Sequence, residues 1–226
     1  MNVEIHYRPS NTAAKILLEA GDSCTAEAGS MIAMSADCDV QTTTHKRDKG
    51  SLLKSVKRLF AGESFFLNHY TAKSQSEVWL SSTLSGDMIV HEQQNSTLIV
   101  QSGSFVACDN EIEVNVGWQG FKGFFSGESL FWLKLQGSGK TLLNSFGAIY
   151  EVDVEDEYVV DTGHIVAFEE SLSFTISKAG TSWVSSFLGG EGLVCRFKGR
   201  GKIYCQSHNP SEFGKSLTPY LRPKKR

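Results

Sequence analysis

The chain has 226 residues, of which 40% are hydrophobic and 21% charged, so it can bury a core and is not a disordered segment. Its formal net charge of -3 excludes a general electrostatic attraction to nucleic acid or anionic lipid. The five cysteines are odd in number and include no C-x-x-C pair, which argues against a disulfide framework and favours reduced thiols.

The start of the chain carries no targeting signal that we recognise. Residues 1–11 contain an early acid and lack the apolar core of a secretory signal peptide. No stretch approaches the 18 apolar residues of a membrane-spanning helix. We therefore predict a cytoplasmic protein without a membrane span, with peripheral attachment to a membrane as an additional hypothesis.

That hypothesis comes from residues 46–60, where basic and apolar side chains alternate with helical spacing. The apolar residues fall on one face of a helix and the Lys and Arg residues on the other. The candidate membrane or partner surface consists of Leu52, Leu53, Lys54, Val56, Lys57, Arg58 and Phe60. Such a composition is typical of a membrane-surface helix, but it also suits a short helix that covers an open end of a sheet. Both interpretations stay open.

Three sequence blocks recur in the same order along the chain, which indicates an internal repeat. The first block is a Gly followed by an apolar run with a central Ala, at 29–34, 103–108 and 163–168. The second is a pair of bulky apolar residues, a small residue and Gly-Glu, at 59–63, 124–128 and 187–191. The third is a short apolar strand that ends in Ser, at 78–82, 141–145 and 203–207. We predict three copies of one unit.

Most of each unit has the pattern of β-strands. Polar and apolar residues alternate at 113–116, 151–154 and 171–176, as they do in a strand with one buried and one solvent-exposed face. Two apolar runs enter a Gly-x-Gly-Lys sequence at 137–140 and 199–202, which we interpret as hairpin turns. The four prolines lie near the termini, so the interior can form continuous ladders. The prediction is an all-β fold with one or more short helices.

No set of residues has the spacing of a catalytic or metal site. The Gly-x-Gly-Lys-Thr at 137–141 lacks the first glycine of a phosphate loop, since position 134 is Lys134. The six histidines are dispersed and none belongs to an H-E-x-x-H motif. Glu63, Glu128 and Glu191 recur with the repeat, but a Glu after a Gly more often accepts local backbone hydrogen bonds than joins a carboxylate cluster. We predict a protein that is not an enzyme and binds no cofactor or metal.

Several runs resemble a widespread bacterial family of uncharacterised proteins that are related to mitochondrial biogenesis (altered inheritance of mitochondria) proteins. They are GESFFLN at 62–68, VQSGSFVA at 100–107, VDTGHIVAFEE at 160–170 and LGGEGLVCRF at 188–197. The resemblance implies three TRAP-like β-sandwich repeats in a pseudo-threefold arrangement, TRAP being the trp RNA-binding attenuation protein. It also implies three chains in a ring of nine units, and it supplies no catalytic residues. The sequence departs from the family at 41–49.

We expect a single domain of three repeats over 1–220, divided at about 1–83, 84–146 and 147–210, followed by a basic tail over 211–226. The predicted function is that of a structural or interaction protein, an oligomeric β-ring scaffold that acts at a membrane surface. The expected partners are two further copies of the chain in a homotrimer, together with a membrane or another protein. The alternative is a module that binds RNA or a small ligand, by analogy with the attenuation protein. Nucleic acid is the less favoured partner, because residues 141–177 contain acids and no Lys or Arg.

Overall fold

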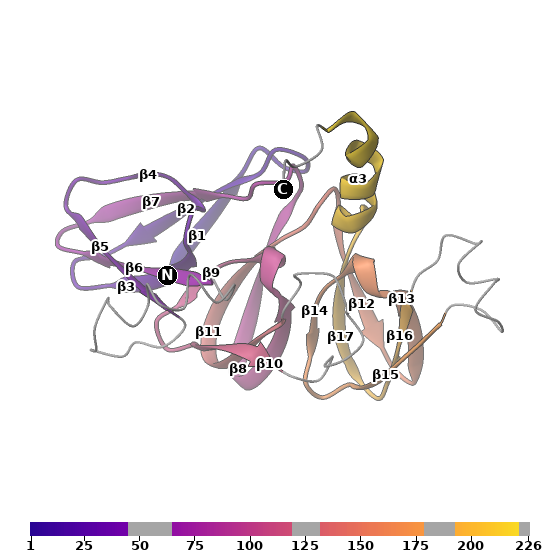
Figure 1. Ribbon diagram of the computed structural model, residues 1–226. Helices are drawn as coiled ribbons and strands as arrows, with labels where there is room; N and C mark the ends of the chain where they lie inside the picture. The colour runs from indigo at the N-terminus through magenta and orange to yellow at the C-terminus, as the bar shows by residue number, and fades with distance from the viewer. Residues whose placement is uncertain (45–64, 119–131, 179–192, 222–226) are drawn as a thin grey trace.

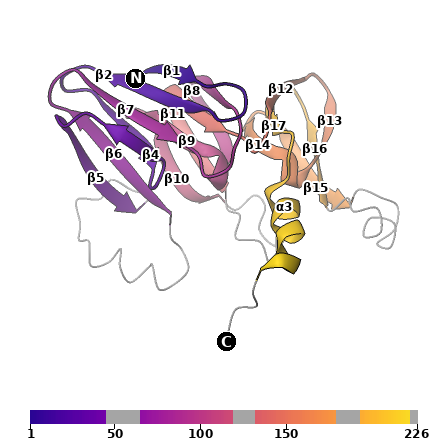
Figure 2. The same ribbon diagram turned by 90° about the horizontal axis from the view of Figure 1, so that it is seen from above.

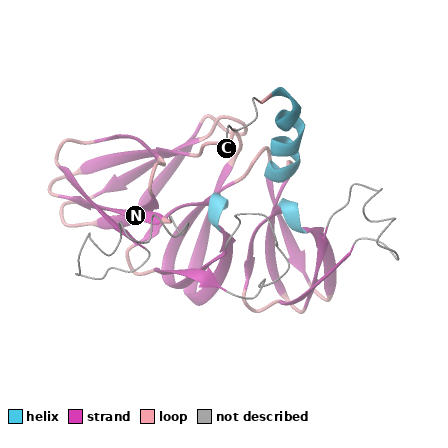
Figure 3. Cartoon of the chain, viewed as in Figure 1, coloured by secondary structure: helices cyan, strands magenta, loops and turns pink. Residues whose placement is uncertain are grey.

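The computed structural model describes residues 1–44, 65–118, 132–178 and 193–221. These residues form seventeen strands, three short 3₁₀ helices and one α helix. Strand dominates the drawing coloured by secondary structure (Figure 3). The three segments with alternating polarity are the strands β10 (Glu113–Trp118), β12 (Ile149–Val154) and β15 (Ser173–Lys178). The predicted all-β fold is confirmed.

The strands fall into three groups that lie side by side in chain order (Figures 1 and 2). The first strand group contains β1 (Asn2–His6), β2 (Ala13–Leu18), β3 (Ser23–Glu27), β4 (Met31–Met34), β5 (Cys38–Thr44), β6 (Phe66–Ala72) and β7 (Ser76–Ser81). The second contains β8 (Met88–Gln101), η1 (Ser102–Ser104), β9 (Phe105–Asp109), β10 and β11 (Trp132–Asn144). The third contains β12, β13 (Glu157–Asp161), η2 (Thr162–His164), β14 (Ile165–Glu169), β15, β16 (Leu193–Lys198) and β17 (Gly201–Gln206).

One antiparallel pairing order occurs in all three groups. In the first group β7 lies between β2 and β4, and β6 lies between β3 and β5. In the third group β17 lies between β12 and β14, and β16 lies between β13 and β15. The second group uses two long strands for the same pattern: β8 and β11 run side by side, with β9 on one half of β11 and β10 on the other.

Neighbouring groups are joined by strand pairing rather than by side-chain packing alone. Strand β3 of the first group pairs with β9 of the second, with Ala26 opposite Ala107. Strand β8 of the second group pairs with β14 of the third, with Val100 opposite Ala167. These two junctions merge strands of all three groups into one ten-stranded sheet. A four-stranded sheet, β1-β2-β7-β4, and a three-stranded sheet, β13-β16-β15, remain at the two ends.

The hairpin prediction for the Gly-x-Gly sequences is wrong. Residues 137–140 lie inside β11, where the ladder with β8 shifts register between Gly137 and Gly139. Both glycines have positive φ angles, of 143° and 135°. A Cβ at Gly137 would lie 2.5 Å from the carbonyl oxygen of Glu111, so only glycine fits this bend. At 199–201 the chain turns from β16 to β17, which belong to different sheets and do not pair.

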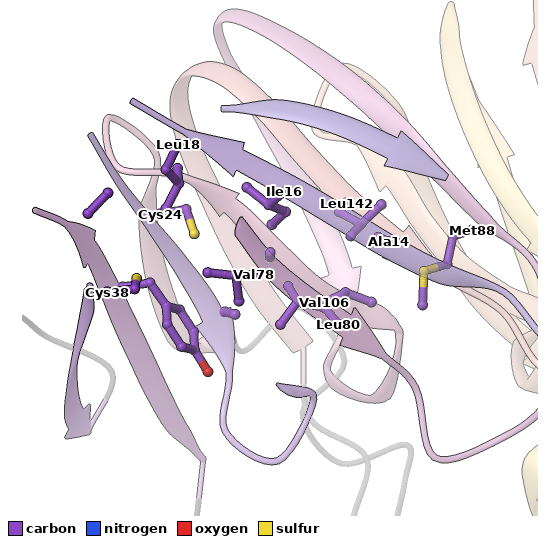
Figure 4. Close-up of a cluster of buried hydrophobic side chains, with 14 residues drawn as sticks. Ala14, Ile16, Leu18, Cys24, Cys38, Val78, Leu80, Met88, Val106 and Leu142 are labelled. Carbon is purple, nitrogen blue, oxygen red and sulfur yellow. The ribbon is translucent and has the colours of Figure 1, made fainter. Parts of the chain in front are cut away.

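Three buried clusters form the core. The cluster of the first group, drawn in Figure 4, includes Ile16, Val78 and Leu80, and it also receives Val106 and Leu142 from the second group. The other two clusters likewise combine side chains from adjacent groups. Because apolar contacts cross both junctions, we expect the groups to fold as one cooperative unit.

A helix follows the last strand, where the sequence suggested only a basic tail. Helix α3 covers Pro210–Leu217. Its first turn is capped by Asn209, whose side-chain oxygen accepts from the backbone N–H groups of Ser211 and Glu212. Proline at the first helical position supplies a pre-set φ angle. The ring of Phe213 packs 5.2 Å from that of Phe146.

Candidate interaction surface

The surface proposed from the sequence lies outside the described residues. This applies to Leu52, Leu53, Lys54, Val56, Lys57, Arg58 and Phe60, and also to the recurring Glu63, Glu128 and Glu191. Where the chain is described, no helix is long and apolar enough to cross a membrane.

The cysteines are buried thiols rather than activated nucleophiles. All five are free and buried. Burial raises the pKa of Cys24 and of Cys195 to about 12 and that of Cys205 to about 11. Since the thiolate is the reactive form, these side chains are unreactive at neutral pH. Over the described ranges no three His, Cys, Asp or Glu side chains gather as a metal site would require.

His91 and Tyr204 form a buried contact between the second and third groups. The Nδ1 atom of His91 lies 2.6 Å from the Tyr204 hydroxyl oxygen. Burial lowers the pKa of His91, which keeps the imidazole neutral at physiological pH. Both residues are buried, so the pair fastens two strand groups together and offers no surface to a ligand.

Asp87 performs a similar task between the first two groups. Its carboxylate accepts two hydrogen bonds of 2.9 Å from Arg8 and a third, of 3.2 Å, from the Thr12 hydroxyl. The backbone N–H of Met88 donates at 2.8 Å. Burial by itself would raise the pKa of Asp87, but these donors outweigh it and hold the pKa below its usual range. This cluster therefore links the first and second strand groups through a salt bridge and hydrogen bonds.

Four of the exposed apolar residues indicate a different site, on one strand at each end of the strand array. Strands β9 and β14 are covered on their outer edges by β3 and β8. As a result Phe105 and Ile165 are both 0% exposed. Strand β4 has the same place in the first group, and no described strand pairs with its outer edge. Met31 is 42% exposed and Ile32 57%.

Strand β13 is the corresponding open edge of the third group. Strands β3 and β8, which have the same place in the other groups, each pair with a strand of the next group. Strand β13 has β16 as its only ladder partner among the described strands. Tyr158 is 44% exposed and Val159 43%, whereas Leu98 and Ile99 of β8 are 0% exposed. An uncovered strand without Pro or an inward-pointing Lys is a ready template for pairing.

The two open edges are complementary in register. The same register occurs at both junctions within the chain. The Ala of the recurring apolar block lies opposite the residue that stands three positions before the recurring Gly of the preceding group. Ala107 therefore lies opposite Ala26, and Ala167 lies opposite Val100. Ala33 and Val160 occupy these places on β4 and β13. A further junction of the same kind between two copies of the chain would place Val160 opposite Ala33 and Val159 opposite Met34.

The sequence predicts the block at 29–34 as one of three equivalent blocks, but it does not predict that the side chains of this block are exposed. The recurring pattern gives each copy the same apolar strand. Only the topology shows that two of the three strands are covered on both edges, while the third has one edge that no described strand pairs with.

Comparison with known proteins gives a consistent assignment. The sequence model of the family described as "Mitochondrial biogenesis AIM24" matches residues 3–208. An uncharacterised protein of Streptococcus pyogenes serotype M6 is 28% identical over 213 residues, covering 92% of this chain and 86% of its own length. A crystal structure of a Streptococcus pyogenes protein superimposes with a TM-score of 0.79 at 27% identity, covering 97% of this chain and 99% of that one.

Proposed function

This chain belongs to the mitochondrial biogenesis AIM24 family, and from that premise we propose that it is a non-enzymatic scaffold whose copies join head to tail into a closed ring of three chains. The observation that carries the proposal is the pair of open edges. Among the described strands, β4 at one end and β13 at the other have an unpaired edge with exposed apolar side chains, and each has a covered counterpart inside the chain.

The pairing order supports a description of the chain as three equivalent β units. The units correspond to the first, second and third strand groups, close to the boundaries expected at residues 83 and 146. Because β13 and β4 belong to different ends of the same chain, their pairing is heterologous and repeats from copy to copy. A ring closes such a chain of contacts and leaves neither β4 nor β13 open, whereas an open filament would keep one of each. The number three comes from the family resemblance.

Copies joined in this way would unite the two sheets that stand alone in one chain. The three-stranded sheet β13-β16-β15 would extend into β4-β7-β2-β1 of the next copy. Each junction inside the chain unites strands in the same order, as β5-β6-β3 continues into β9-β11-β8. The scaffold would therefore consist of one type of junction, used both within and between chains.

Cysteine cross-linking tests the register directly. We expect the double variant Val159→Cys/Met34→Cys to form covalent dimers and trimers with a short bifunctional thiol reagent, because directly opposed residues have Cβ atoms about 5 Å apart. The native thiols are buried with raised pKa values and should react slowly. In the control variant Val159→Cys/Ala33→Cys the pair is one residue out of register, which puts the side chains on opposite faces. Equal cross-linking of both variants, or of neither, would contradict the proposed edge.

A charge on the open edge tests the assembly. We expect native mass spectrometry to find a trimer for the natural sequence and a monomer for Val159→Asp, since an acid at a buried junction loses its hydration without a partner. Val40→Asp is a matched control, because Val40 lies on the edge strand β5 and is 44% exposed against 43% for Val159. It should stay trimeric. A monomeric natural protein would overturn the ring.

Action at a membrane surface is a separate part of the proposal, and it rests on the sequence pattern of residues 52–60. We expect the protein to float with vesicles that contain anionic lipid, and the variant Lys54→Glu/Lys57→Glu/Arg58→Glu to remain unbound. If Phe60→Glu unfolds the protein while vesicle binding of the natural protein is absent, the segment serves the fold instead. RNA binding stays a prediction from the sequence.

A further inference from the structure

A polar pocket of about 380 Å³ lies where β3, β7, β8 and β11 end, between the first and second strand groups. Glu27, Gln101, Ser104 and Asn144 supply polar side chains to its lining, and Val106 and Phe146 supply apolar surface. The volume is that of a site for a small molecule. Pro210, at the start of α3, completes one side.

Three of the residues that supply polar side chains are largely buried, and their side chains make no hydrogen bond within the described part of the chain. Gln101, Ser104 and Asn144 are 3%, 2% and 4% exposed. Over the described residues, no donor or acceptor reaches their side chains. Their polar atoms are not among the buried unpartnered atoms of the described chain, so they face the pocket, where water or a ligand can pair with them.

Other polar groups of the same lining are occupied. The hydroxyls of Ser30 and Ser81 donate to the backbone oxygens of Glu27 and Thr12. Gln206 takes the place in the third group that Asn144 takes in the second. Its Oε1 accepts from the Phe146 N–H at 2.9 Å, and its Nε2 donates to the Gly163 carbonyl at 3.1 Å. The fold therefore satisfies its own polar groups here except for those that converge on the pocket.

Glu27 determines the charge of the pocket. It is the single ionisable residue of the described lining, which contains no Lys, Arg or His. Burial raises the pKa of Glu27 to about 7. A carboxylate whose negative charge is disfavoured by burial is stabilised by a cation that brings its own hydrogen-bond donors. An anionic ligand would meet repulsion and find no positive side chain among the described residues of the lining.

We propose that this pocket binds a small alkylammonium ion. The three N–H donors of a primary ammonium match three acceptor groups, namely the Glu27 carboxylate, the Gln101 amide oxygen and the Asn144 amide oxygen. The alkyl portion would lie against Val106 and Phe146, and the Ser104 hydroxyl could take a further polar group of the ligand. The site is independent of the ring, because none of these residues belongs to β13 and none lies on the open edge of β4.

Three probes of similar size and different charge test the ligand class on the full chain at pH 8 and constant ionic strength. They are n-butylammonium chloride, sodium butyrate and 1-butanol. The binding of each is measured by isothermal titration calorimetry and by saturation-transfer NMR. We expect butylammonium to bind about tenfold or more tightly than butanol, since a charge-assisted hydrogen bond is roughly twice as strong as a neutral one. Butyrate should bind most weakly. Equal binding of butylammonium and butanol, preference for butyrate, or no binding of butylammonium up to roughly 10 mM would overturn the proposal.

Variants then test the residues. Glu27→Gln should reduce the affinity for butylammonium about tenfold and abolish its advantage over butanol. The substitution should fold, because the second strand group carries Gln101 at the corresponding place after β8 residue Val100. Glu19→Gln, on an exposed residue outside the pocket, is the matched control and should bind like the natural protein. As a second variant, Gln101→Leu should weaken butylammonium binding and retain the preference for the cation. Unchanged affinity in both pocket variants would show that the probe binds elsewhere.

Discussion

Strands β9 and β4 have the same place in the pairing order and very different surroundings. Each pairs along one edge with the last strand of its group, and each ladder has a register shift in the middle of the apolar block. Strand β9 is covered on its other edge by β3, so Val106 is 1% exposed. Strand β4 has no such cover among the described strands, and Ile32, at the equivalent position, is 57% exposed.

The apolar character of β4 is the feature for which we propose a contact between two copies of the chain. Met-Ile-Ala-Met at 31–34 is as apolar as Phe-Val-Ala-Cys at 105–108. Sheet proteins usually protect a free edge with charge, Pro or a bulge that turns it away. Strand β4 has the bulge but also keeps four apolar side chains, which fits a strand that is covered after assembly.

The largest expected effect on stability comes from placing an aspartate at the equivalent positions of β9 and β4. Val106→Asp should destabilise the fold by more than about 4 kcal/mol, because it buries an unpaired carboxylate and removes core packing. Ile32→Asp should change the free energy of unfolding of the monomer by less than about 0.5 kcal/mol, since the side chain is exposed there. Urea unfolding of each variant, made in the monomeric Val159→Asp background so that the proposed trimer does not bury Ile32, measures both values. Similar losses in the two variants would mean that β4 is covered within a single chain.

Asp87 and Ala148 precede the first strands of the second and third groups, and only Asp87 has a side chain that can accept hydrogen bonds. Asp87→Ala should cost about 2 kcal/mol at pH 7, because Arg8, Thr12 and Met88 lose a shared acceptor. The lowered pKa of Asp87 means that its stabilisation is present above about pH 4 and is lost as the pH falls through the folded-state value.

Unfolding followed from pH 7 to pH 3 measures this contribution. The Asp87→Ala variant should lose less stability on acidification than the natural protein does. Asp39→Ala is the control, since the Asp39 side chain is 59% exposed and its ion pair with Lys73 contributes little. A loss in Asp39→Ala as large as in Asp87→Ala would contradict the assignment.

A smaller effect is expected from the amides that end the strands of the second and third groups. Gln206→Leu should destabilise the protein by about 1–2 kcal/mol, because the Phe146 N–H and the Gly163 carbonyl lose their partner. Gln101→Leu should be neutral or stabilising, because its amide has no partner to lose among the described residues. Thermal unfolding at pH 7 gives both values, and the reverse order would show that Gln101 is satisfied in solution.

The smallest effect concerns Glu27, whose counterpart in the second group is neutral. Since burial raises the pKa of Glu27 from 4.5 to about 7, the folded state binds more protons than the unfolded state between these values. Stability from this group should therefore rise as the pH falls from about 7 to 4.5. Glu27→Gln should be more stable than the natural protein at pH 8 by about 1 kcal/mol, a modest value because partial exposure screens the charge. Identical pH profiles for the two proteins would contradict the raised pKa.

Several features could be predicted from the sequence and others could not. The alternation at 113–116 and 151–154 predicts strands correctly, because one-sided burial imposes a period of two. The Gly-x-Gly at 137–139 predicts a turn but forms a bend inside β11, since such a bend requires the same glycines as a hairpin does. Asn209-Pro210 followed by Glu212 has the composition of a helix start, a signal for α3 that was overlooked.

The fold class and the apolar blocks at 29–34, 103–108 and 163–168 can be read from the sequence, because strand periodicity and burial act locally on each block. The tertiary structure alone decided which blocks are covered, since that depends on the order of groups along the chain and not on the residues of any block. It also decided that Gln101, Asn144 and Glu27 meet in one pocket. These residues are up to 117 positions apart in the chain, and only the pairing of strands brings their ends together.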